Sequence, residues 1–394
     1  MQTIHQRFRR VAIAAAIVLP LVSHAADALR PDVAKPLNVA QDLYRAHKYK
    51  DALTKIDQAA AVPGKTPYES TMIEEMRGAA AAAAGESGIA AQAYETLLAS
   101  GKLTGADEQR TSAALAGIYF QEKNYAQAAK VAQRYLKSGG SDPDMRMLLV
   151  QSYYLSNDCA SVVSVLKPSV DAQVHAGHAP DESQLQLLGT CAQRVKDDAT
   201  YRSSLEKLVA YHPKQSYWDS LFAAIRNKPG YSSALDIDTY RLRRATGSLS
   251  TADDYMEMTQ LAIVAGTTAE GKQVIDQGFA SGVLGHDAQT DREKRLQALA
   301  AKRAQAPADP ANPVAPLDIG FNQVFAGQAK QGLAAMDSAI SKGGLDHPDQ
   351  AQLHLGEAYY VAGDKARAVQ TFRGVKGNDG SADLARLWVL VASK

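Results

Sequence analysis

The chain has 394 residues and nearly equal numbers of basic (43) and acidic (42) side chains. This length exceeds what one compact core usually organises, but a solenoid accommodates it, because each repeat packs only on its neighbours. Beyond the N-terminal segment no basic cluster could follow a phosphate backbone, which argues against nucleic-acid binding.

Residues 1–25 have the pattern of a secretory signal peptide. Three arginines, the last of them Arg10, precede an uncharged run over 11–22, and small residues lead up to Ala25. We therefore expect cleavage after Ala25 and a periplasmic or secreted protein with a net charge of −2. The alternative is an uncleaved N-terminal anchor, but the run is short for a membrane span.

Residues 111–138 predict two short antiparallel helices joined by a turn at Asn124 and Tyr125. Apolar residues recur at spacings of three and four on one side of each helix: Leu115, Ala116, Tyr119 and Phe120, then Ala128, Val131, Ala132 and Tyr135. The small residues Ala116 and Ala128 lie where the two helices would approach most closely. Such a hairpin needs neighbours of the same kind to bury its apolar side.

Copies of this pattern recur along most of the chain after residue 35. The clearest follow Leu188, Ile319 and Leu355, and weaker copies begin near Val39, Arg77, Leu149 and Met258. The pattern, with a period of about 34 residues, resembles the tetratricopeptide repeat. This resemblance implies an all-α fold: a right-handed α-α superhelix of about eight helical hairpins. It also implies a scaffold or adaptor that binds protein or peptide partners through its concave side.

The expected organisation has five parts. An N-terminal repeat array over 26–213 follows the signal peptide of residues 1–25. Divergent hairpins over 214–304 continue it, and a linker over 305–316 with four prolines precedes a C-terminal repeat pair with a capping helix over 317–394.

The two cysteines are expected to form a disulfide. Cys159 should begin the second helix of one hairpin, and Cys191 lies in the first helix of the next. These helices should be adjacent and antiparallel, and an exported protein meets an oxidising environment. Two free thiols are the alternative.

Motifs of catalysis, cofactor binding and metal binding are weak. Residues 266–272 match most of a phosphate-binding loop, but Gln273 replaces the hydroxyl residue, and a turn between helices explains Gly266. His175 and His178 lack further ligands at a suitable spacing, so a solvated loop is the preferred interpretation. We therefore expect no enzymatic activity, no cofactor and no metal site.

One position in each first helix should face the concave side, and four of its eight residues are aromatic in a chain with 7% aromatic residues. The position holds Tyr44, Ala82, Phe120, Tyr154, Gln193, Ile263, Val324 and Tyr360, and the next residue adds Phe325. Tyr44, Phe120, Tyr154, Phe325 and Tyr360 are therefore candidates for peptide binding. The same rings could instead pack between hairpins.

Two further comparisons concern the partner. Chaperone-binding members of the repeat family clamp a C-terminal carboxylate with Lys and Asn, but the matching positions here include Leu37, Gln41 and Gly117, so that clamp is absent. Residues 208–218 resemble a stretch of exported repeat proteins associated with TonB, ExbB and ExbD systems. This leaves two hypotheses: a general periplasmic adaptor, or an accessory part of an envelope energy-transduction or outer-membrane uptake complex.

Overall fold

The computed structural model describes residues 28–306 and 316–393, and all its regular structure is helical. The expected signal peptide and nearly all of the proline-rich linker lie outside these residues. Among the helices described, none combines the length and the apolar character that a membrane crossing requires.

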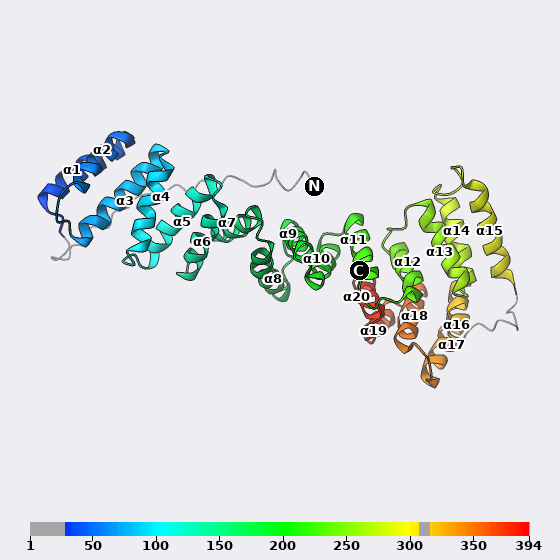
Figure 1. Cartoon of the computed structure of the whole chain (residues 1–394). Helices are drawn as coiled ribbons and strands as arrows, with labels where there is room; N and C mark the ends of the chain where they lie inside the picture. Colours follow the sequence, from blue (N-terminus) through cyan, green and yellow to red (C-terminus); the bar gives the residue numbers. More distant parts are fainter. Residues whose placement is uncertain (1–27, 307–315, 394) are drawn as a thin grey trace. The chain divides into compact units, whose positions relative to one another are not determined.

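The chain forms two compact units (Figure 1). The N-terminal unit holds residues 28–178 and 190–196, and the C-terminal unit holds 179–189 and 197–393. The helices of the N-terminal unit are α1 (Pro31–Arg45), α2 (Tyr49–Ala60), α3 (Pro67–Ala84), α4 (Ser87–Ala99), α5 (Gly105–Gln121), α6 (Tyr125–Lys137), α7 (Pro143–Leu155) and α8 (Cys159–His175). Helix α9 (Glu182–Arg194) contributes its first half to the C-terminal unit and its second half to the N-terminal unit.

The C-terminal unit contains eleven further α-helices and one short 3-10 helix within the residues described. They are α10 (Asp198–Tyr211), α11 (Gln215–Arg226), η1 (Ser233–Leu235), α12 (Asp236–Ala245), α13 (Ala252–Val264), α14 (Thr268–Ala280), α15 (Thr290–Gln305), α16 (Pro316–Phe325), α17 (Ala329–Lys342), α18 (Pro348–Val361), α19 (Lys365–Phe372) and α20 (Ser381–Ala392).

Eight helix pairs share one turn geometry, which confirms the repeat register expected from the sequence. The first and second helices of these pairs are α1/α2, α3/α4, α5/α6, α7/α8, α9/α10, α13/α14, α16/α17 and α18/α19. Between them the chain passes through one left-handed residue with φ between +58° and +84°: His47, Gly85, Lys123, Asn157, Lys196, Gly266, Gly327 or Gly363. This residue follows the predicted concave-face position by three residues in every pair. It reverses the chain, and the second helix begins two residues later.

Small residues let the paired helices approach each other closely. Ala116 and Ala128 are fully buried, as the sequence predicts. In the α16/α17 pair the contact is closer still, because a Cβ on Gly320 would lie 2.8 Å from the backbone oxygen of Gly332. A side chain at Gly320 would therefore force these two helices apart.

The C-terminal unit closes on itself. The contacts run from α12 to α13, α14, α16, α18 and α20, and α20 contacts α12 again. We call these six helices the helix ring. The sequence correctly predicts that the last helix packs on the final hairpin, since α20 contacts α18 and α19, but it does not predict the contact with α12.

Polar contacts fix α20 in this position. Asp383 accepts hydrogen bonds from Lys228 (2.6 Å) and Arg386 (2.6 Å), and Trp388 donates to Glu357 on α18 (2.9 Å). Arg386 also pairs with Glu206 on α10 at 3.1 Å. The last helix is thus bound to Lys228, which precedes α12, and to helices α18 and α10.

Candidate functional site: a pocket inside the helix ring

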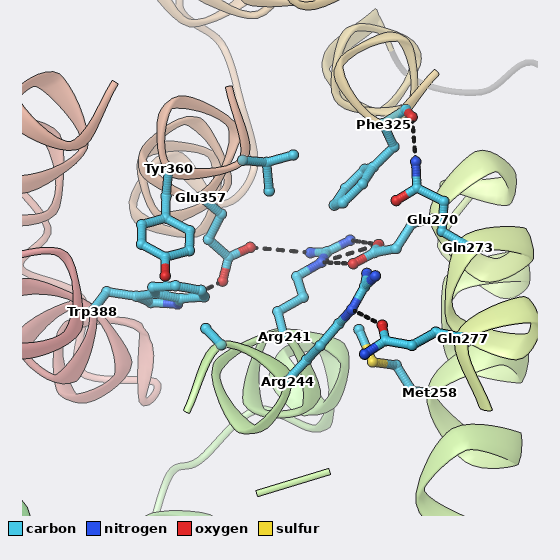
Figure 2. A pocket seen from close by; sticks show the side chains of 12 residues that line it. Arg241, Arg244, Met258, Glu270, Gln273, Gln277, Phe325, Glu357, Tyr360 and Trp388 are labelled. Atoms are coloured by element: carbon cyan, nitrogen blue, oxygen red, sulfur yellow. Dashed lines mark hydrogen bonds and ion pairs between the residues drawn. The ribbon is translucent and has the colours of Figure 1, made fainter. Parts of the chain in front are cut away.

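A pocket of about 370 Å³ lies inside the helix ring, and all six helices line it (Figure 2). Its walls are formed by Arg241, Arg244, Ala245, Met258, Glu270, Gln273, Gln277, Phe325, Glu357, Tyr360, Val361 and Trp388. Because the pocket depends on the closure of α20 against α12, single repeats do not contain it.

One wall of the pocket is a buried charge network centred on Arg241. Its side chain is 4% exposed, and its Nε and Nη2 donate to the two carboxylate oxygens of Glu270 at 3.0 and 2.7 Å. Its Nη1 donates to Asp238 Oδ1 at 2.7 Å and to Glu357 Oε2 at 3.2 Å. The guanidinium also lies 4.4 Å from the centre of the Phe321 ring. Arg241 therefore joins α12 to α14, α16 and α18.

Burial and neighbouring charge set the protonation of this network. Burial raises the pKa of Glu357 well above its usual value, and the negative charge of Asp238 raises it further. Burial acts on Asp238 in the same direction, but His354 and Arg241 overcome it and hold the pKa of Asp238 below its usual value. Of these two carboxyl groups, Asp238 is therefore ionised, whereas Glu357 favours its protonated form.

Arg244, one helical turn beyond Arg241, lies in different surroundings. Its Nε donates to Gln277 Oε1 at 2.9 Å, and among the residues described it forms no ion pair with a carboxylate. Burial lowers the pKa of Arg244 from its usual value, and Glu270 counteracts this at longer range. The other N–H groups of this guanidinium line the pocket and donate to no residue described here. A carboxylate from a ligand would be a suitable acceptor for them.

Another part of the pocket wall is aromatic and includes two residues that the sequence predicts for binding. Tyr360 is half-buried, with its ring centre 4.9 Å from that of Trp388. Phe325 is nearly buried, and its backbone oxygen accepts a hydrogen bond from Gln273 (2.7 Å). The adjacent Val361 is 44% exposed and marks where this wall meets solvent.

The other three aromatic candidates lie in the N-terminal unit. Tyr44, Phe120 and Tyr154 are all half-buried. Tyr44 contacts Tyr49 (ring centres 5.3 Å apart) and Phe120 contacts Tyr125 (5.5 Å), so in both repeats the ring spans the turn to the start of the second helix. The guanidinium of Arg194 lies over the Tyr154 ring at 5.4 Å. These contacts give each ring a packing role, while its remaining exposed area keeps the binding hypothesis open.

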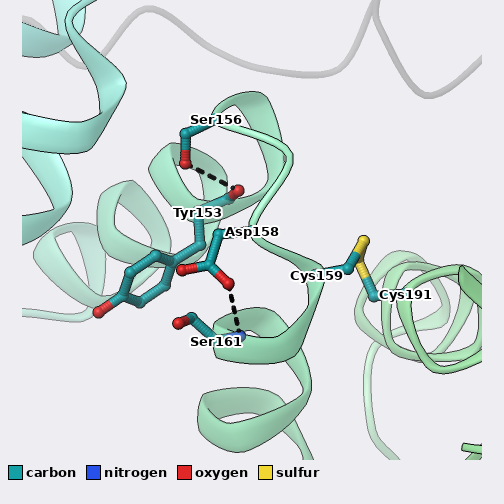
Figure 3. Close-up of a disulfide and its surroundings, with 6 residues drawn as sticks. All are labelled: Tyr153, Ser156, Asp158, Cys159, Ser161 and Cys191. Atoms are coloured by element: carbon teal, nitrogen blue, oxygen red, sulfur yellow. Dashed lines mark hydrogen bonds between the residues drawn. A yellow bond between two sulfur atoms is a disulfide. The ribbon is translucent and has the colours of Figure 1, made fainter. Parts of the chain in front are cut away.

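Cys159 and Cys191 form a disulfide within the N-terminal unit (Figure 3). Their Cα atoms are 4.8 Å apart. Cys159 is the first residue of α8, as expected, because Asp158 caps this helix by accepting a hydrogen bond from the Ser161 backbone N–H (3.0 Å). Both cysteines are almost fully buried, so the bond joins α8 to α9 from inside the fold.

The weak sequence motifs have structural roles. Gly266 provides the left-handed turn between α13 and α14, and Lys272 pairs with Asp276 (2.5 Å) on the same helix. His175 is the last residue of α8 and, like His178, is exposed. These features agree with the interpretation of the phosphate-loop match as a turn and of the two histidines as solvated.

The stretch that resembles TonB-associated proteins runs from the end of α10 into the first turn of α11. Trp218 is 6% exposed and stacks on Phe222 with ring centres 5.6 Å apart. The Tyr217 hydroxyl meets Glu182 and Gln186 on α9. The aromatic residues of the motif thus serve helix packing in this unit.

Sequence reasoning misses the charged residues of the pocket. Arg241 and Glu357 are 116 positions apart, and only the ring closure brings them together. A local signal does exist, because α12 carries Asp238, Arg241 and Arg244 at helical spacing on the side that turns inward. Charged side chains on the inner side of a helix indicate a buried ion network, but they do not identify its partners.

Comparisons with known proteins identify the repeats. The tetratricopeptide repeat family model matches residues 75–143 and 317–383, about a third of the chain, so these two segments are tetratricopeptide repeats. No curated protein sequence matches this chain.

Solved structures give only distant likenesses. The TPR domain of P58(IPK) is 12% identical, with a TM-score of 0.25, covering 92% of this chain and 97% of that one. Yeast Tom70 is 10% identical, with a TM-score of 0.27 and coverages of 92% and 95%. The Naa15/Naa10 structure bound to HypK-THB is 13% identical, with a TM-score of 0.23 and coverages of 89% and 63%. The fold assignment rests on the helix pairs themselves.

Proposed function

We propose, from the tetratricopeptide repeats in residues 75–143 and 317–383, that this chain is a non-catalytic scaffold that binds segments of other proteins. The helix pairs of the repeat build surfaces from side chains of successive helices, which suits the capture of extended or helical peptides. The aromatic position of the first helices supplies apolar contact area with little loss of rotamer entropy.

One observation carries the proposal furthest. Phe325 and Tyr360, chosen from the repeat pattern alone, line one pocket together with Arg244, whose guanidinium lacks a carboxylate partner among the residues described. A protein segment with an acidic group beside an apolar side chain complements these three residues. The carboxylate would accept hydrogen bonds from Arg244, and the apolar group would lie against Tyr360 and Phe325.

We further propose that the scaffold acts outside the cytoplasm. The signal-peptide pattern of residues 1–25 supports export, and the Cys159–Cys191 disulfide suits an oxidising compartment. Mass spectrometry of the protein from the envelope fraction tests this proposal. A mature chain that begins at Ala26 is expected, and an intact Met1 start would contradict export with cleavage.

The sequence resemblance of residues 208–218 supports the alternative of an accessory part in a TonB, ExbB and ExbD complex. Because Tyr217 and Trp218 serve helix packing, we favour the general scaffold. Deleting the gene distinguishes the two. Impaired growth on a substrate that requires a TonB-dependent receptor would favour the alternative, whereas normal growth would count against it.

Single Phe120→Ala, Tyr154→Ala and Tyr360→Ala variants test the scaffold function. Each variant is compared with the wild type for its melting temperature and for the partners that it crosslinks in the native envelope. A binding residue should lose partners with little change in melting temperature, because an exposed ring leaves no cavity. A ring that is only core should cost roughly 3 to 5 kcal/mol of stability when truncated. If all three variants melt much earlier, the aromatic position is not a binding surface.

A further inference from the structure

Three potential metal ligands converge behind the pocket wall. One ligand atom each of Asp238, His354 and Glu357 can be chosen so that all three lie within 4.8 Å of one another. Ligands at 2.0–2.2 Å around a tetrahedral ion are about 3.5 Å apart, so small side-chain rotations would bring these atoms to coordination distance. The three residues come from α12 and α18, which the ring closure holds side by side.

The buried charges leave room for a cation. Arg241 makes a two-pronged ion pair with Glu270, in which each group neutralises the other. Its Nη1 amino group then donates one N–H to Asp238 and one to Glu357, so these two buried carboxyl groups share a single guanidinium with Glu270. A further carboxyl group, that of Asp318 on α16, has no hydrogen bond or ion pair among the residues described. Burial raises the pKa of Asp318, and the charges of His354, Arg241 and Asp238 also act on it. A divalent ion would match the charge that the Asp238 and Glu357 pair carries when both carboxyl groups are ionised.

Two unsatisfied atoms point to the same place. Asp238 is fully buried, yet its Oδ2 has no hydrogen-bond partner within the described part of the chain. His354 Nε2 lies 3.0 Å from Asp238 Oδ1 but, among the same residues, also lacks a properly aligned hydrogen bond. Buried polar atoms are almost always satisfied, so these two neighbouring unsatisfied atoms need an explanation.

The surrounding contacts resemble the outer shell of a metal site. Arg241 orients both carboxylates, the Trp388 N–H holds Glu357 Oε1 at 2.9 Å, and the Phe321 ring lies 5.6 Å from the imidazole. Such contacts fix the direction of first-shell ligands. The His354 side chain is 18% exposed, which gives an ion a route from solvent and gives the ring freedom to turn.

We infer that Asp238, His354 and Glu357 bind one divalent transition-metal ion, with one imidazole nitrogen and two carboxylate oxygens as ligands. This donor set suits Zn²⁺, which takes His nitrogen and Asp or Glu oxygen in tetrahedral sites with water in the remaining position. The ion would replace the proton that the carboxyl pair otherwise holds. It would then join α12 to α18 at the ring closure.

Calorimetric titration of the metal-free full-length chain with ZnCl₂ tests this inference. The wild type should bind one equivalent of zinc and melt at a higher temperature when zinc is present. His354→Gln should bind at least about tenfold more weakly and should lose the zinc-dependent rise in melting temperature. The exposed His347, at the N-terminus of the same helix, provides the control: His347→Gln should behave like the wild type.

Two results would overturn the metal site: no zinc bound by the wild type, or equal binding and stabilisation of His354→Gln and the wild type. If His354→Gln loses its helical circular dichroism, Co²⁺ titration of the wild type decides instead. Visible absorption bands of tetrahedral cobalt at one equivalent are then expected, and their absence would refute the site.

Discussion

Arg241 and Arg244 lie one turn apart on the same helix and serve opposite purposes. Arg241 is enclosed by three carboxyl groups, whereas Arg244 has only an amide partner. Removing one partner of a buried ion network leaves uncompensated charge, while removing a hydrogen bond to an uncharged amide at a half-buried site costs less.

Replacing each arginine by methionine separates the two roles. Arg241→Met should lower the free energy of unfolding by about 3 to 5 kcal/mol, because Asp238, Glu270 and Glu357 lose their shared cation. Arg244→Met should change it by no more than about 1 kcal/mol, because the stem still packs in the pocket. Urea unfolding of both variants measures this difference. Similar losses in the two would contradict the assignment of Arg241 to structure and Arg244 to binding.

Asp383 predicts a pH dependence of the contacts that hold α20. Burial would raise its pKa, but hydrogen bonds from Lys228 and Arg386 lower it below the ordinary value of 3.8. A lowered pKa stabilises the fold above the unfolded-state value, and this contribution disappears as the pH falls through the folded-state value. Asp383→Asn should therefore be less stable than the wild type at pH 7, with a difference that shrinks below pH 3.8. An equal difference at pH 3 and pH 7, measured by urea unfolding, would exclude this ion pair as its cause.

At the scale of the element, the repeat register could be predicted from the sequence because it is local. Spacings of apolar residues, the small residues Ala116 and Ala128 and the turn at Asn124 all lie within one hairpin, and the structure has each in its expected place. The left-handed residue of each turn is glycine in four repeats, but His47 and Lys123 occupy the same conformation. At these two positions the residue type does not indicate the left-handed conformation, because the register of the helix pair imposes the turn.

Substitutions at this turn position should act in opposite directions. Lys123→Gly should raise the free energy of unfolding by up to about 1 kcal/mol, because glycine adopts φ of +61° without the strain of a side chain. Gly363→Ala, at φ of +84°, should lower it by about 1 kcal/mol. Thermal unfolding monitored by circular dichroism compares the two, with Gly88→Ala as a control. Gly88 lies in a helix with open space around its Cα, so alanine should be neutral or slightly stabilising there. Destabilisation by Lys123→Gly would contradict the shared geometry.

The disulfide constrains one connection between neighbouring hairpins and leaves the packing of all others unchanged. It closes a loop of 32 residues, which in the chain-entropy model contributes roughly 3 to 4 kcal/mol. Alkylation of the denatured, unreduced protein should label neither thiol. Reduction should lower the melting temperature and preserve helix content at room temperature, since the hairpins still pack on their neighbours. Full labelling without reductant, or loss of the helical signal on reduction, would contradict this account.

At the scale of the whole molecule, the pocket could not be predicted because it depends on contacts between distant segments. The sequence pattern identifies Phe325 and Tyr360 as candidates, since their repeats are local. It does not identify Arg244 or the Arg241 network, because α12 lies outside the eight repeats and meets α20 only in the closed ring. The repeat pattern predicts how adjacent hairpins pack on each other. It does not predict that α20 returns to contact α12.

The central claim, that the pocket binds an acidic segment of a partner protein, can be tested with matched peptides. An array would present each short sequence twice, once with Asp or Glu and once with Asn or Gln at the same position, beside an apolar residue. Wild-type protein should bind acidic members about tenfold more tightly than their amide counterparts, because an ion-paired hydrogen bond between Arg244 and a carboxylate exceeds one from Arg244 to an uncharged amide by about 1.4 kcal/mol. Arg244→Met should remove that preference, and Tyr360→Ala should weaken both members of each pair. Equal binding of acidic and amide peptides by the wild type, or a preference unchanged in Arg244→Met, would contradict the account.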